Sequence, residues 1–247
     1  MTHYLAVLLK SSRITAILVL VAFVASLYPP HLHAQGAADL QARIGELKES
    51  MARNKEALSH YTWKETVHII LKGDEKRTEH FEVRQGPDGK PVKTPLDPSD
   101  TAQQPAEGGR LRQRVVAKKK EEYREYADQM KELAQHYVPP DKDAIQDAYA
   151  KGNIAIIPEG SVPGLIKLVI HNYYKPGDTV TLSFDKNEKL LRSISVASWM
   201  DDPQDAMNLT VAFDRLPDAT NHVSNVTVEG VRKQLTVKTA NSDYRKI

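Results

Sequence analysis

The residue types that most often do chemistry are present in this sequence, but their spacing does not assemble a site. The chain has nine histidines. Those beyond the N-terminal segment are spread over separate stretches, without the H-E-x-x-H or H-x-H spacing that brings two imidazoles onto one metal ion. No metal or other cofactor is therefore expected. The acidic cluster of Asp201, Asp202 and Asp205 is interpreted as a turn, because Asp side chains accept hydrogen bonds from nearby backbone amides.

Nucleophilic catalysis has no recognisable basis in the sequence either. The chain contains no cysteine, which excludes thiol catalysis. It also lacks the G-x-S-x-G elbow of serine hydrolases, the P-loop and the G-x-G-x-x-G turn of dinucleotide-binding folds. The sequence therefore predicts a protein that is not an enzyme, and a hydrolase remains only a third hypothesis.

Aromatic and branched apolar side chains are the other source of a binding site, since such residues line the pockets of apolar ligands. The same residues also fill a core or cover a sheet. Two hypotheses therefore stay open: a carrier that keeps a cavity, and a structural or interaction protein of the cell envelope with a packed core. The candidate ligand-binding residues are Trp63, Val67, Ile69, Tyr123, Tyr126, Phe184 and Trp199.

A basic run follows a polar stretch in the middle of the chain. Residues 95–112 are rich in Pro, Asp, Gln and Gly and have no periodicity, so a mobile loop is predicted there. The plain interpretation of the run is the solvated start of a helix, neutralised by the glutamates that follow three and four residues on. The functional alternative is contact with an anionic membrane surface. The run consists of Arg110, Arg112, Arg114, Lys118, Lys119 and Lys120.

The N-terminal segment has the pattern of a secretory signal peptide. Lys10 and Arg13 precede an apolar run at 14–28, which ends at Pro29 and Pro30. The run is shorter than the roughly 20 residues of a membrane span. Cleavage after Ala34 is expected, which gives a signal peptide at 1–34, and an uncleaved anchor in the inner membrane is the alternative.

Removal of this segment changes the charge balance. The formal net charge is +2, and Lys10 and Arg13 are the only charged residues in the removed part. The mature chain is then neutral, so attraction to nucleic acid is not expected. Without a cysteine for lipid attachment, the predicted location is the periplasm.

The elements that must position the candidate residues follow from periodicity. Residues 38–59 and 116–137 have the apolar spacing of amphipathic helices, and Asp141 is expected to cap a short helix at 141–150. Apolar and polar residues alternate in the predicted strands at 61–72, 78–85 and 154–157, and in a meander of five or six strands at 165–237. The predicted fold is α+β, with one domain at 35–247. A curved antiparallel sheet, an incomplete β-barrel, is covered by the N-terminal helix and two mid-chain helices.

This order of elements resembles the outer-membrane lipoprotein-sorting family, the LolA/LolB-like half-barrels. The matching motif is the strand-turn-strand TVTLSFDKNEKLLRSISV at 179–196, with its F-D-x-x-x-x-L-L-R step. The chain also looks like exported bacterial proteins that share the Tyr61-Thr62-Trp63 opening strand and the ending at 241–244. The resemblance implies a half-barrel closed by helices around an apolar cavity. The expected function is therefore that of a periplasmic carrier for a lipid or acyl chain.

Overall fold

The computed structural model describes residues 45, 49, 52–87, 90–96, 110–160 and 163–247. The chain separates into two units, Met1–Gly45 and Glu46–Ile247, and the second contains every element named below. The expected signal segment and residues 97–109 of the expected loop lie outside the described residues. Of the expected N-terminal helix, residues 52–58 are described and are helical.

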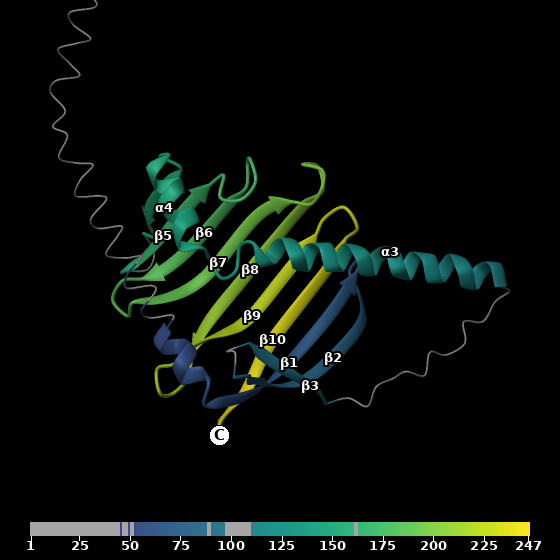
Figure 1. Cartoon of the computed structure of the whole chain (residues 1–247), viewed down its shortest axis with the longest axis horizontal. Helices are drawn as coiled ribbons and strands as arrows, with labels where there is room; N and C mark the ends of the chain where they lie inside the picture. Colours follow the sequence, from purple (N-terminus) through teal and green to yellow (C-terminus); the bar gives the residue numbers. More distant parts are fainter. Residues whose placement is uncertain (1–44, 46–48, 50–51, 88–89, 97–109, 161–162) are drawn as a thin grey trace, which may run out of the picture. The chain divides into compact units, whose positions relative to one another are not determined.

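The described strands form one antiparallel sheet, which is not closed. Its order is β3-β2-β1-β10-β9-β8-β7-β6-β5-β4, so the first strand pairs with the last and β3 and β4 are the outer strands. Figure 1 shows this succession. The strands are β1 (Tyr61–Leu71), β2 (Asp74–Gln85), β3 (Pro91–Pro95), β4 (Ile154–Pro158), β5 (Leu165–His171), β6 (Thr179–Asp185), β7 (Leu190–Trp199), β8 (Ala206–Arg215), β9 (Asn221–Gly230) and β10 (Leu235–Lys246).

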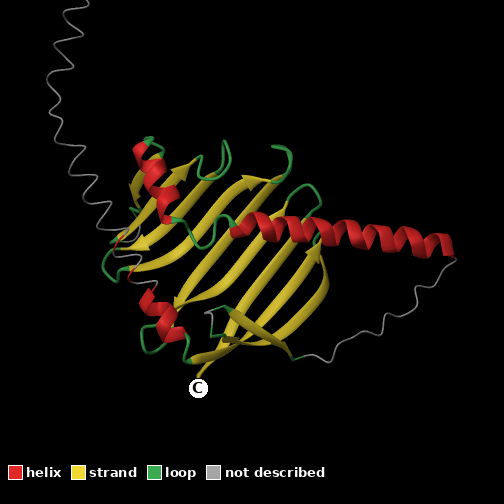
Figure 2. Ribbon diagram, viewed as in Figure 1, coloured by secondary structure: helices red, strands yellow, loops and turns green. Residues whose placement is uncertain are grey.

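The two helices between β3 and β4 follow from this topology. The chain leaves the sheet at one outer strand and re-enters at the other, so it must travel the full width. Nine strand spacings of about 4.8 Å make roughly 43 Å. The helix α3 (Arg110–Gln135) has 26 residues, or about 39 Å, and α4 (Lys142–Ala150) follows it. Figure 2 shows the C-terminal part of α3 lying across the strands and its N-terminal part extending beyond them.

The two faces of the sheet differ sharply in chemistry, because side chains alternate along each strand while neighbouring strands stay in register. We call them the apolar face and the polar face. One row of paired residues on the apolar face is Ile154, Ile170, Val180, Val196, Leu209, Val228, Val237 and Ile69. The adjacent row on the polar face is Val169, Thr181, Ser195, Thr210, Thr227, Lys238 and His68.

The helices confirm two predictions and correct one. Asp141 caps α4, and its Oδ1 accepts a hydrogen bond of 2.8 Å from the amide of Ala144. The buried positions of α3 are Tyr126, Met130 and Leu133, spaced as an amphipathic helix requires. The helix begins at Arg110 rather than at 116, because the residues between are good helix formers. Among the described residues no helix is both long and apolar enough to span a membrane.

Two further expectations about the strands are wrong. β3 was not predicted, because all five of its residues are exposed and it lacks an alternating pattern. The predicted meander at 165–237 counted Val231 to Gln234 as strand, but these residues form the turn between β9 and β10, and β10 continues to Lys246. Pro95, expected in the loop, ends β3. The α+β fold with a curved, open antiparallel sheet is confirmed.

Candidate functional site

One part of the apolar face is only partly covered. Along the row described above, the residues of β5 to β8 are at most 3% exposed, whereas Val228, Val237 and Ile69 are partly exposed. The neighbouring row of Val226, Thr239 and Val67 is partly exposed as well. We call these six residues, on β9, β10 and β1, the apolar strip. The strip has no charged side chain on its floor.

The helix α3 bounds one end of the strip. Tyr126 of α3 lies over Gly230, the last residue of β9. The phenol of Tyr126 donates a hydrogen bond of 2.6 Å to Oδ1 of Asp205. Burial and this carboxylate raise the pKa of Tyr126 above its ordinary value, so the hydroxyl remains a donor. Nearby, Nζ of Lys233 lies 3.1 Å from Oε1 of Glu122. These contacts hold α3 at the β9–β10 turn.

An aromatic cluster bounds the other end. Trp63 of β1 stacks on Tyr244 of β10 with a centroid distance of 5.5 Å and an interplanar angle of 16°. Tyr61 and His222 also contact the Tyr244 ring, at 6.4 Å and 4.2 Å. Burial raises the pKa of Tyr244, and its hydroxyl donates to the carbonyl of Val223 at 3.1 Å. The cluster is therefore a rigid wall of rings.

A buried carboxylate with an exposed cationic partner lies between the aromatic cluster and the strip. Glu65 of β1 is 7% exposed and pairs with Nζ of Lys93 on β3. The partner of Glu65 comes from β3, a strand that the sequence did not predict. The indole Nε1 of Trp63 is also buried here, without a hydrogen-bond partner among the described residues. This end of the strip thus combines apolar rings with polar groups.

The structure brings some of the candidate ligand-binding residues together and separates others. Trp63, Val67 and Ile69 lie along one side of β1, and Tyr126 and Tyr123 lie on the part of α3 beside Lys233. The two others lie apart from the strip. Phe184 is on the covered part of the apolar face, and Trp199 has the opposite parity, its Nε1 donating to the carbonyl of Pro176.

The remaining members of the strip come from β9 and β10, which sequence reasoning missed as site elements. The signal was present, because Val226 and Val228 alternate with Asn225, Thr227 and Glu229. Their proximity to β1 could not be predicted from the sequence, because it depends on the pairing of the first strand with the last.

A second polar cluster lies near the C-terminal end of α3 and has a structural role. Asp178 is 1% exposed and accepts hydrogen bonds from the backbone amides of Tyr173, Tyr174 and Lys175, and from the phenol of Tyr137 at 2.8 Å. Burial raises the pKa of Tyr137. The adjoining hollow has a volume of about 180 Å³, below the roughly 300 Å³ at which ligand pockets begin. Its lining is Gln129, Glu132, Leu133, His136, Tyr174, Lys175, Met200 and Asp201.

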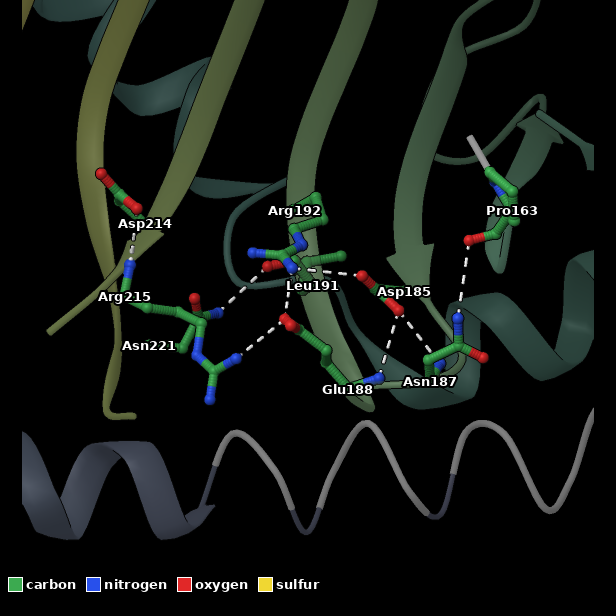
Figure 3. Close-up of polar contacts among 9 residues, drawn as sticks. All are labelled: Pro163, Asp185, Asn187, Glu188, Leu191, Arg192, Asp214, Arg215 and Asn221. Atoms are coloured by element: carbon green, nitrogen blue, oxygen red, sulfur yellow. Dashed lines mark hydrogen bonds and ion pairs between the residues drawn. The ribbon is translucent and has the colours of Figure 1, made fainter. Parts of the chain in front are cut away.

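The F-D-x-x-x-x-L-L-R step also has a structural explanation, drawn in Figure 3. Oδ1 of Asp185 accepts hydrogen bonds from the amides of Asn187 and Glu188 at 3.0 and 3.1 Å, which closes the β6–β7 turn. Arg192 pairs with Asp185 and Glu188, and Arg215 of β8 reaches Glu188 at 2.9 Å. These contacts lower the pKa of Asp185 despite its partial burial. The motif therefore fixes a hairpin.

Comparison with known proteins adds one distant likeness. No family model and no curated protein matches the chain. Among solved structures, the chain is similar to a DUF1329 family protein from Desulfovibrio piger ATCC 29098. The identity is 12%, the match covers 83% of this chain and 92% of that one, and the TM-score is 0.42. The class of protein is defined by the chain's own fold: an open antiparallel sheet with a helix lying across its apolar face.

Proposed function

We propose that the protein is an exported binding or carrier protein that holds an apolar chain, such as a lipid or acyl chain, on the apolar strip. One observation carries this proposal. The same row of branched aliphatic residues is buried in β5 to β8 and partly exposed in β9, β10 and β1. Burying apolar surface contributes about 25 cal/mol per Å² to the free energy of binding. A ligand that covers the partly exposed residues of the strip is therefore bound favourably.

The ends of the strip define the orientation that such a ligand takes in this proposal. The floor of Val67, Ile69 and Val237 offers only contacts to an alkyl chain. Lys93 and the indole N–H of Trp63 are donors that lie toward the aromatic end. Beside the strip, Arg77 of β2 is the cross-strand partner of Ile69 and forms an ion pair of 2.6 Å with Glu79. In this orientation the alkyl part of an acyl chain contacts the apolar floor, and its carboxylate or other polar head lies toward Lys93.

The proposed periplasmic location rests on the N-terminal sequence. The positive residues, the short apolar run and the break after it have the order of a secretory signal. A carrier of acyl chains in that compartment needs a site that opens to solvent, and the partly exposed strip provides one.

The test is the thermal stability of the protein with and without a long-chain fatty acid. A ligand that binds only the native state stabilises it by about 2.7 kcal/mol at a hundred times its dissociation constant. For a chain of this length, that corresponds to a rise in Tm of roughly 5–10 °C. Ile69→Thr places a hydroxyl on the strip and should weaken binding about tenfold, because the buried hydroxyl lacks a partner.

The matched control is Ile70→Thr, the same change one residue away. Ile70 is also partly exposed, but it lies on the polar face, opposite Thr236. Its substitution should leave the ligand-induced shift unchanged. If no acyl chain raises the Tm, or if the two variants lose binding equally, the carrier proposal is refuted. The packed residues of β5 to β8 would then favour a structural or interaction protein of the envelope.

A further inference from the structure

The N-terminal half of α3 is a cationic helix segment that is exposed to solvent throughout its described side chains. Every residue from Gln113 to Glu122 is exposed, whereas the buried positions of the helix begin at Tyr126. In Figure 1 this half runs out beyond the strands. Val115 and Val116 are 56% and 49% exposed, which is unusual for adjacent valines in a helix.

The acidic residues that follow do not neutralise this half. Glu121 pairs with Arg124 at 3.9 Å, and Glu122 pairs with Lys233 of the β9–β10 turn. Both partners lie on the side away from the basic run. Within the described residues, no ion pair is formed by Arg114, Lys118, Lys119 or Lys120. The basic run is therefore the solvated start of a helix, as the plain interpretation expects, but the glutamates that follow form their ion pairs with other residues.

The direction of the helix adds to this imbalance. The N-terminal end of a helix carries a partial positive charge, so cations there are unfavourable and anions are favourable. The first turn of α3 contains no acidic residue, and its sequence includes Arg110 and Arg112. An external negative charge would relieve the repulsion between the dipole and the basic residues.

We propose that residues 110–120 form a docking surface for a membrane rich in anionic phospholipid. These eleven residues contain six cations and no acidic group, and clusters of four to eight basic residues are typical of sites that bind acidic lipid headgroups. At 3.6 residues per turn the six basic positions are distributed around the helix rather than along one side, so charge supplies the attraction. Val115 and Val116 add apolar contact at the level of the headgroups. This surface is separate from the apolar strip, and the inference does not rest on the proposed ligand.

The experiment is co-sedimentation of the full chain with vesicles of phosphatidylcholine, with and without phosphatidylglycerol. The apolar segment at 14–28 would bind both kinds of vesicle, so the difference between them is the measurement. The variant Lys118→Gln/Lys119→Gln/Lys120→Gln keeps good helix formers at exposed positions. Each lysine contributes about fivefold to binding of an anionic surface, so the variant should lose roughly a hundredfold of the phosphatidylglycerol-dependent affinity.

The control changes the same net charge elsewhere. Lys72→Gln/Lys186→Gln/Lys238→Gln alters three exposed lysines on turns and on the polar face, and it should keep most of the affinity. Equal loss in both triple variants would show that only the overall charge matters and would overturn the inference. Equal binding of wild type to both vesicles would overturn it too. A preference for duplex DNA over phosphatidylglycerol vesicles, lost in the first variant, would assign the surface to nucleic acid instead.

Discussion

Replacing Gly230 by alanine should disturb the packing of α3 on the sheet. A Cβ at this position would lie 2.7 Å from the hydroxyl oxygen of Tyr126 and 2.8 Å from Sδ of Met130, distances at which something must move. Tyr126 and Met130 are 4% and 1% exposed, so neither has free space to enter. Overpacking of this kind costs about 1–3 kcal/mol, and we expect Gly230→Ala to lower the free energy of unfolding by that amount.

A double-mutant cycle shows whether the loss arises at Tyr126. Tyr126→Phe removes the hydroxyl that donates to Asp205 and should cost about 1.5–3 kcal/mol by itself. In combination with Gly230→Ala the two losses should be less than additive, with a coupling of at least about 0.5 kcal/mol, because a ring that is no longer bonded to Asp205 can move away from the new Cβ. Urea unfolding at neutral pH measures each free energy, provided that the slope is unchanged.

Gly160→Ala is the control for this cycle. Gly160 is exposed, and an added Cβ there meets no atom within 4 Å. Its substitution should change stability by less than about 0.5 kcal/mol. The packing of α3 on Gly230 would be refuted if Gly230→Ala changed the free energy of unfolding as little as Gly160→Ala. It would also be refuted if the losses of stability in Gly230→Ala and Tyr126→Phe were additive.

Three other predictions follow from single features. Hydrogen bonds from Tyr61 and Lys246 hold the pKa of Asp218 well below its ordinary value; this stabilisation is present above the unfolded pKa and is lost as pH falls through the folded one. Asp218→Asn should therefore lose less stability than wild type when the pH falls from neutral to below about 4, and an identical pH dependence of the two Tm values would contradict this. Asp178→Ala leaves three partly buried amides and the buried Tyr137 phenol without their acceptor, so it should cost at least about 3 kcal/mol in urea unfolding; a loss below about 1 kcal/mol would count against that role. The intact mass of the exported protein should lack residues 1–34, and a mass that retains them would favour the membrane anchor.

Most of the fold could be predicted from the sequence, because most strands have one face that is buried and one that is exposed to solvent. Val180, Leu182 and Phe184 are all buried and alternate with polar residues, as predicted. β3 shows the limit of this reasoning: its five exposed residues carry no pattern, and it is a strand only because β2 offers it a free edge.

The candidate site was harder to predict from the sequence than the fold, because it depends on contacts between distant parts of the chain. Ile69 could be placed on the apolar side of its strand, but the pairing with Val237 and Val228 joins the first strand to the last. The Glu65–Lys93 pair was hidden for the same reason. The parity of Trp199 could have been seen, since it is out of phase with Ile194 and Val196 in the same strand.

The most direct test of the central claim is photo-crosslinking with a long-chain fatty acid that carries a diazirine near its methyl end. Labelled peptides are mapped by mass spectrometry, and an excess of unlabelled fatty acid serves as competitor. Labels that the competitor removes are expected on β1, β9 and β10, in the peptides that contain Ile69, Val228 and Val237. Labels confined to the polar face, or none that the competitor removes, would contradict it.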